Sequence, residues 1–278
     1  MPGEPFTFTT ASVTPAGVVT TLQGQGHRKS FDLGGTPLEM VWIPPGEFMM
    51  GSLAWEGPRS EQPPHRVNFS EGFWLGRYPV TQAQWRYGAT LPSVSCELAP
   101  NPSRFKGPDR PVEGVFWTDA QEFCDRLSQD QSQRFQLPSE AQWEYACRAG
   151  TTTPFAFGKT LTTNLANYNG NSTYGKEPKG YYRQRTTAVG RFPANGWGLH
   201  DMHGTVWEWC EDTWHPNYDG APTDGRAWVG DRSSSWLVRG GSWYSTPEKC
   251  RSAARYRNVA HIFNDLRGFR LALLCTGS

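Results

Sequence analysis

Net charge is nearly absent from this 278-residue chain. Its 27 Lys and Arg residues almost cancel its 26 Asp and Glu residues, which leaves a formal net charge of +1 at pH 7. A chain without a surplus of positive charge makes no extended field for a polyanion. We therefore expect neither nucleic acid nor a membrane surface as a partner, and no apolar run is long enough to span a membrane.

Paired cysteines are also missing. The six cysteines lie far apart, none belongs to a Cys-x-x-Cys pair, and the N-terminus carries no secretory signal. These absences favour reduced thiols and a cytoplasmic location. The histidines show no zinc-ligand spacing with cysteine, and no Ser-His-Asp order, phosphate-binding glycine loop or catalytic carboxylate pair stands out.

Aromatic residues, glycine and proline are abundant instead. Aromatics make up 14% of the chain, including 13 Trp, and the chain contains 30 Gly and 22 Pro. This composition is typical of turns and irregular loops held in place by large rings. It argues against a helical bundle and against a regular parallel α/β sheet.

The first 34 residues predict a β-hairpin. Two stretches of strand-forming residues, 6–13 and 18–25, flank a turn that contains Pro15 and Gly17. We expect residues 1–34 to form an extension at the edge of a single larger domain, residues 35–278. The composition of the chain stays uniform from residue 35 on, with no linker and no clear repeat.

Three helices are predicted, each from a hydroxyl residue followed three positions later by glutamine. The apolar positions that follow the second and third starts place Cys124 and Cys147 on buried helix faces. Helix signals nearly vanish after Gly150, so the second half should consist of loops and short strands. The three capping pairs are Thr81 with Gln84, Thr118 with Gln121, and Ser139 with Gln142.

The segment 237–273 is the candidate functional region. Its left end places Gly240 and Gly241 before Trp243, which suits a strand that enters through a tight bend. Its right end, 268–271, alternates as a half-buried strand does. The middle, 256–266, has neither helical nor strand periodicity and mixes apolar with polar residues, which is typical of a loop that forms a contact surface.

Seven motifs in order give the chain a clear resemblance to a known family. They are MVWIPPGEFMMGS, FWLGRYPVTQAQW, RPVEGVFWTDAQEFCDRL, RFQLPSEAQWEYACRAG, GWGLHDMHGTVWEWCEDTW, RGGSWYSTPEKCRSAAR and RGFRLAL. Between Leu38 and Cys275 the chain resembles the formylglycine-generating enzyme (sulfatase-modifying factor) domain. The resemblance implies an α+β, C-type lectin-like fold, rich in irregular loops, with short strands and about three helices.

The resemblance does not extend to the family's copper site. Oxidases of this family hold copper(I) between two cysteines that follow the Gly-Gly-Ser-aromatic motif, and they convert a substrate cysteine to formylglycine. Here Ser245 stands at the first cysteine position and Cys250 at the second. Copper(I) prefers two soft thiolates, so we expect no copper and no enzyme activity, with Cys250 as a packed thiol.

The C-terminal segment also resembles the variable region of proteins that diversity-generating retroelements diversify. In those systems AAC asparagine codons become NNC codons, which cannot encode Trp, Met, Gln, Lys or Glu. An ordinary irregular loop is the alternative. The positions that match asparagine clusters of the template, and that should form an exposed ligand-binding face, are Tyr244, Ser245, Thr246, Ala254, Tyr256, Asn258, Val259, His261, Ile262 and Phe263.

The family also binds calcium around a Gly-x-x-Trp-Glu motif. The resemblance puts a structural calcium ion on four positions, and two of these residues carry carboxylates, the oxygen ligands that a hard cation needs. A solvated or salt-bridged acidic turn is the alternative, and a second family site lacks a carboxylate because Lys179 occupies its place. The four positions are Asp201, Gly204, Val206 and Glu208.

Together these observations predict a non-catalytic binding protein. Its C-terminal surface, diversified in the manner of a retroelement variable protein, would bind a protein or peptide. Trp243, Cys250, Arg251, Phe269 and Leu271 would form the buried framework beneath that surface. Two alternatives remain: a copper-dependent formylglycine-generating oxidase with a changed ligand set, and a non-catalytic module of a signalling protein.

Overall fold

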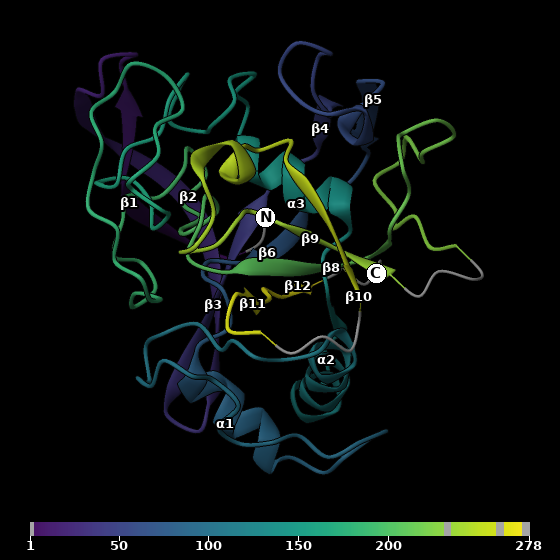
Figure 1. Ribbon diagram of the computed structural model, residues 1–278. Helices are drawn as coiled ribbons and strands as arrows, with labels where there is room; N and C mark the ends of the chain where they lie inside the picture. The colour runs from purple at the N-terminus through teal and green to yellow at the C-terminus, as the bar shows by residue number, and fades with distance from the viewer. Residues whose placement is uncertain (1–2, 231–234, 260–263, 274–278) are drawn as a thin grey trace.

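The computed structural model describes residues 3–230, 235–259 and 264–273, without the side chain of Val259, and Figure 1 shows its arrangement. A six-stranded sheet runs in the order β1-β2-β3-β6-β12-β7, and a four-stranded sheet in the order β10-β9-β8-β11. The strands of the first sheet are β1 (Glu4–Val13), β2 (Val19–Leu33), β3 (Thr36–Ile43), β6 (Phe73–Gly76), β7 (Phe135–Gln136) and β12 (Ala272–Leu273). Those of the second are β8 (Trp207–Thr213), β9 (Ser235–Arg239), β10 (Arg255–Val259) and β11 (Arg267–Gly268).

The predicted N-terminal hairpin is present and forms the edge of the larger sheet. β1 and β2 pair antiparallel from Glu4 opposite Arg28 to Val13 opposite Val19. β2 then continues beyond the hairpin and pairs with β3. Phe6 and Phe8 are buried in the same apolar cluster as Trp143, so the hairpin packs onto the core of the domain.

The first and third predicted helices are confirmed at their capping residues. α1 (Gln82–Thr90) begins after Thr81 and α3 (Glu140–Arg148) after Ser139, each with a complete capping box. In these boxes the cap hydroxyl accepts an amide hydrogen bond, and the glutamine three residues later accepts one from the cap amide. Both helices therefore start where the hydroxyl-glutamine spacing predicts.

The second helix begins earlier than its predicted cap at Thr118. α2 (Trp117–Gln131) follows Phe116, whose amide donates to the Asp119 carboxylate at 2.9 Å. The prediction was wrong because a carboxylate at the third helical position serves the free amide better than Gln121 does. Cys124 and Cys147 are fully buried, as expected.

Beyond Gly150 the described residues contain only loops, short strands and η2, a 3-10 helix (Pro247–Cys250). A two-stranded sheet of β4 (Gly46–Met50) and β5 (His65–Phe69) stands beside α3, and η1 (Arg59–Glu61) lies in the loop between them. One part of the C-terminal prediction was wrong, because the start of the expected loop 256–266 pairs with β9 as strand β10. No described helix is long and apolar enough to cross a membrane.

Candidate functional site

A glycine turn carries the chain from β9 into the candidate surface. Gly240 and Gly241 have φ angles of 93° and 78°, in the region that disfavours side chains. A Cβ atom on Gly241 would lie 2.5 Å from the sulfur of Cys250. The turn therefore needs glycine for conformation and for space, and it places the Trp243 amide 3.1 Å from the carbonyl oxygen of Thr205.

Two exposed tyrosines pack against buried tryptophans. Tyr244 is 60% exposed and meets Trp243 edge-on, with ring centroids 5.6 Å apart. Tyr256 is 47% exposed and stacks on Trp207, with centroids 5.4 Å apart. A ring packed on one side and open on the other can contact a ligand with little loss of conformational entropy.

The two supporting tryptophans are neighbours. The indole nitrogen of Trp243 donates to the carbonyl oxygen of Asp265 at 3.2 Å. The amide of Trp207 donates to the carbonyl oxygen of the next residue, Leu266, at 2.7 Å. Because consecutive residues bind both supports, Tyr244 and Tyr256 belong to one region of the surface.

The remaining predicted surface positions divide into three groups. Ser245 and Thr246 are half-buried beside Tyr244. Ala254 and Asn258, at 1% and 3% exposure, are buried, and this corrects their predicted exposure. The side chain of Val259 and the residues His261, Ile262 and Phe263 lie outside the described part of the chain.

The burial of Ala254 and Asn258 has a local cause. The Ala254 amide donates to the Arg251 carbonyl at 3.1 Å, and the Ala254 carbonyl accepts a hydrogen bond from Arg239, so this residue closes a turn under the surface. Asn258 lies opposite Trp236 in the β10–β9 pair.

The predicted framework is confirmed, because all five of its members are buried: Trp243, Cys250, Arg251, Phe269 and Leu271.

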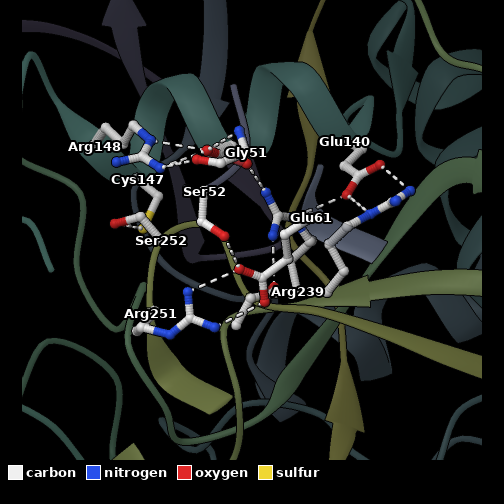
Figure 2. A network of polar contacts seen from close by, with 12 residues as sticks. Gly51, Ser52, Glu61, Glu140, Cys147, Arg148, Arg239, Arg251 and Ser252 are labelled. Carbon is white, nitrogen blue, oxygen red and sulfur yellow. Dashed lines mark hydrogen bonds and ion pairs between the residues drawn. The ribbon is translucent and has the colours of Figure 1, made fainter. Parts of the chain in front are cut away.

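Buried arginines fix the underside of the C-terminal segment to the N-terminal half (Figure 2). Both terminal nitrogens of Arg251 donate to Glu61 at 2.8 Å, and the hydroxyl of Ser52 donates to the same carboxylate at 2.7 Å. A bidentate pair of this kind sets the orientation of both planar groups. The ends of η1 and η2 are thereby held together.

A second group of pairs binds the edge strand β10 and its neighbour β9 to α3. Arg255 donates to Glu140 at 2.6 and 2.8 Å, and the Tyr218 hydroxyl donates to Glu140 at 3.0 Å. Arg239 pairs with Glu144, and its neighbourhood of carboxylates raises its pKa, although burial opposes this. Sequence reasoning missed these pairs. The spacing of Glu140 and Glu144, one helical turn apart on α3, was the available sign.

The residues at the two copper positions do not fit copper(I). The hydroxyl oxygen of Ser245 accepts a hydrogen bond from the Ser242 amide at 3.0 Å. Burial raises the pKa of the Cys250 thiol, so the thiolate that a soft metal needs is disfavoured. A serine hydroxyl and one buried thiol cannot supply a two-thiolate site.

The calcium positions fit a cation in part. The carboxylate of Glu208 accepts from Arg270 at 2.6 and 2.8 Å and from the indole of Trp143 at 2.6 Å, so its oxygens already have donors. Asp201 accepts from the Gly190 amide at 2.8 Å, and burial raises its pKa to about 6. Asp201 also lines a cavity of about 10 Å³ with Asn167, whose side-chain oxygen is buried without a hydrogen-bond partner among the described residues. Calcium stays a prediction, better supported at Asp201 than at Glu208.

Sequence comparison relates the chain to one family. Residues 30–274 match the sulfatase-modifying factor enzyme 1-like domain. Serine/threonine-protein kinase pkn1 of Chlamydia caviae is 32% identical over 84% of this chain and 38% of the kinase. Formylglycine-generating enzyme of Mus musculus is 32% identical over 80% of this chain and 57% of that enzyme. The chain thus spans less than two thirds of the length of these relatives.

Two solved structures share the fold. PvdO from Pseudomonas aeruginosa superposes with a TM-score of 0.76 at 34% identity and covers 88% of this chain and 97% of PvdO. Treponema denticola variable protein 1 superposes with a TM-score of 0.74 at 24% identity and covers 88% of this chain and 98% of that protein. The expected α+β, C-type lectin-like fold is therefore confirmed.

Proposed function

The chain belongs to the sulfatase-modifying factor enzyme 1-like family, and within it we propose a non-catalytic member that binds a protein or peptide through its C-terminal surface. We propose further that this surface is diversified as in a retroelement variable protein. The observation that carries the proposal is the pair of exposed tyrosines, Tyr244 and Tyr256, on adjacent buried tryptophans. Partly exposed aromatic rings on a rigid base are frequent anchors of protein interfaces.

The framework supports the same function. A surface that tolerates many side chains needs a backbone whose shape does not depend on them. Here the turn glycines, the Arg251–Glu61 pair and the Arg255–Glu140 pair provide that independence, because none of them involves an exposed position. The Treponema denticola protein of the same fold is itself called a variable protein.

Two experiments test the proposal. The genome beside the gene should contain a reverse transcriptase and a near-copy of the segment 237–273 that carries AAC codons at the variable positions. A library randomised at Tyr244, Ser245, Thr246 and Tyr256 should yield folded variants that select different protein ligands. Absence of the near-copy would reject diversification, and a library of mainly unfolded variants would reject the display surface itself.

A formylglycine-generating oxidase is the second candidate, favoured by the similarity to the mouse enzyme over most of this chain. Such an enzyme would need another thiolate in place of Ser245. Purified protein incubated with copper(I), oxygen and a cysteine-containing sulfatase peptide should form no aldehyde under our proposal. Turnover in that assay, abolished by Cys250→Ala, would favour the oxidase.

A signalling-associated binding module is the third candidate, favoured by the similarity to the chlamydial kinase. It is compatible with ligand binding by the same surface. It predicts that the gene encodes, or lies beside, a kinase domain and that ligand binding changes kinase activity. No change in kinase activity on binding would leave the display function as the better account.

A further inference from the structure

A second cavity lies away from the two tyrosines, between β4 and the C-terminal end of α3. Its volume is about 390 Å³, a size typical of small-ligand sites. Phe48 and Tyr145 form an aromatic wall, with ring centroids 5.2 Å apart. Met49 and Leu53 also line the cavity and are 53% and 51% exposed, so its mouth is apolar.

One carboxylate in this cavity is incompletely paired. Glu56 lines the cavity, and its side chain is only 11% exposed. Its ion-pair partner is Arg251 at 3.6 Å, beyond hydrogen-bond length. Arg251 already makes two hydrogen bonds of 2.8 Å to Glu61. One guanidinium therefore faces two carboxylates, and the second of them lies in the cavity wall.

The arginine that lines the cavity does not supply the missing hydrogen bonds to Glu56. Arg148 lines the cavity, but it donates to Glu144 at 2.8 Å and to the carbonyl oxygen of Gly51 at 2.9 Å (Figure 2). Its guanidinium is held against α3 by these bonds. The cavity thus combines an aliphatic mouth, an aromatic wall and a buried carboxylate with capacity for a further donor.

We propose that this cavity binds a basic side chain, lysine or arginine, of a peptide or protein ligand. The aliphatic stem would pass Met49 and Leu53, and the cationic head would pair with Glu56 and lie near the rings of Phe48 and Tyr145. Trp55, at 81% exposure, stands two residues beyond Leu53 in the same loop, where it is available to the rest of a peptide. Burial already raises the pKa of the Glu56 carboxyl, and a bound cation would favour its ionised form.

This site is independent of the display surface proposed above. It uses residues of β4, of the loop after it and of α3, and none of the variable positions. A ligand can therefore occupy either surface alone, and failure of one proposal leaves the other standing. The buried Arg251–Glu61 pair links the two sites, because Arg251 contacts both Glu56 and η2.

The test uses the full chain and blocked tripeptides Gly-X-Gly, with X as lysine, arginine, norleucine or glutamate. Titrations followed by amide NMR should show saturable shifts at Leu53, Glu56 and Thr151 with the lysine or the arginine peptide. The norleucine peptide, which keeps the stem and lacks the charge, should bind at least tenfold more weakly. Equal binding of norleucine, or shifts located elsewhere, would overturn the proposal.

Two variants and one control sharpen the test. Glu56→Gln should weaken the basic peptide at least tenfold, whereas Glu71→Gln, which removes an exposed charge outside the cavity, should change binding less than twofold. Thr152→Trp should block the cavity from its exposed edge without touching Arg251, so it tests the site even if Glu56→Gln lowers stability. Undiminished binding by the folded Thr152→Trp variant would reject the cavity as the site.

Discussion

The C-terminal segment has two sides with opposite chemistry. Beneath it, Arg239, Arg251 and Arg255 are almost fully buried and pair with glutamates from the first 144 residues of the chain. Above it, Tyr244 and Tyr256 are exposed and contact only the rings below them among the aromatic neighbours described. The two kinds of position alternate in the sequence within a few residues.

This contrast separates what holds the backbone from what meets a ligand. A buried ion pair need not raise stability above that of an apolar pair, but removal of one partner leaves an uncompensated charge. An exposed ring can be exchanged at small cost. Substitutions on the two sides should therefore differ strongly in their effect on folding.

The largest effect is expected for Arg255→Met. This change removes both short ion-pair hydrogen bonds of the buried Glu140 and leaves it only Arg239, at 3.4 Å. Loss of one partner of a buried pair costs about 3–5 kcal/mol in the free energy of unfolding. Arg257→Met, two residues along the same strand at an exposed position, is the control and should cost less than about 0.5 kcal/mol. Urea denaturation measures both, and similar losses would abolish the distinction between the two sides.

The next largest effect is expected at Glu113, whose protonation should make the free energy of unfolding depend on pH. Its carboxylate accepts from the Phe105 amide at 2.8 Å, has no cation as a partner among the described residues, and burial raises its pKa from 4.5 to about 7. The folded state then holds a proton that the unfolded chain releases, so stability is present below pH 4.5 and lost as pH rises through 7.

Glu113→Gln should remove that dependence. Relative to the variant, the native protein should lose stability on the order of 3 kcal/mol between pH 4.5 and 8. Phe105 packs edge-on against Trp243, so the change lies next to the display surface. Urea unfolding at the two pH values measures the effect, and a difference that stays constant with pH would contradict a protonated Glu113.

Ala254→Tyr tests the correction made at this position. Ala254 is only 1% exposed. A large side chain forced into such a packed site lowers the free energy of unfolding by about 1–3 kcal/mol. Thr246→Tyr, at a half-buried position of the same surface, should be milder. Equal melting temperatures for Ala254→Tyr and the native protein would return Ala254 to the set of variable positions.

A calcium ion at Asp201 would stabilise the chain next to the turn that carries Trp243. Asp201 contacts Thr205, whose carbonyl oxygen accepts from the Trp243 amide. An ion at this place should add about 1.4 kcal/mol at ten times its dissociation constant, and a chelator should lower the melting temperature. Asp201→Asn should abolish the chelator effect.

Glu208→Gln is a poor probe because it breaks the Arg270 pair whether or not calcium binds. A melting curve that does not change with chelator would leave Asp201 as a hydrogen-bond acceptor for the Gly190 amide and the Thr205 hydroxyl, without an ion.

The sequence predicted the features that depend on short spacing. The helix starts at Thr81 and Ser139, the hairpin around Pro15 and Gly17, and the glycine bend before Trp243 are all local, and each is confirmed. The fold itself was predicted from the resemblance of the seven ordered motifs to a known family. α2 begins two residues before the predicted start, because the Asp119 carboxylate accepts the hydrogen bond of the Phe116 amide.

The long-range features were not predictable in the same way. Arg251 and Glu61 lie 190 residues apart, and nothing in either neighbourhood names the other. The burial of Asn258 depends on which face of β10 meets the core, and the burial of Ala254 depends on the turn that precedes β10. Residues 256–266 show no strand periodicity, so the sequence predicts neither. The cavity beside Glu56 likewise arises only when β4 packs against α3.

The smallest effect on folding, and the largest on binding, is expected for Tyr244→Asn and Tyr256→Asn. Each side chain is about half exposed, so loss of its ring contact should cost about 0.5 kcal/mol or less in the free energy of unfolding. Once library selection has supplied a ligand for the native surface, truncation of an aromatic anchor should weaken that ligand by about 2 kcal/mol or more, roughly thirtyfold. Trp207→Asn is the contrasting variant, because its ring supports Tyr256 from below and its loss should reduce stability and binding together. Calorimetric titration and urea unfolding of the same samples measure both quantities. If the tyrosine variants lost several kcal/mol of stability, or bound the ligand as the native protein does, the exposed side would be no more a binding surface than the side beneath it.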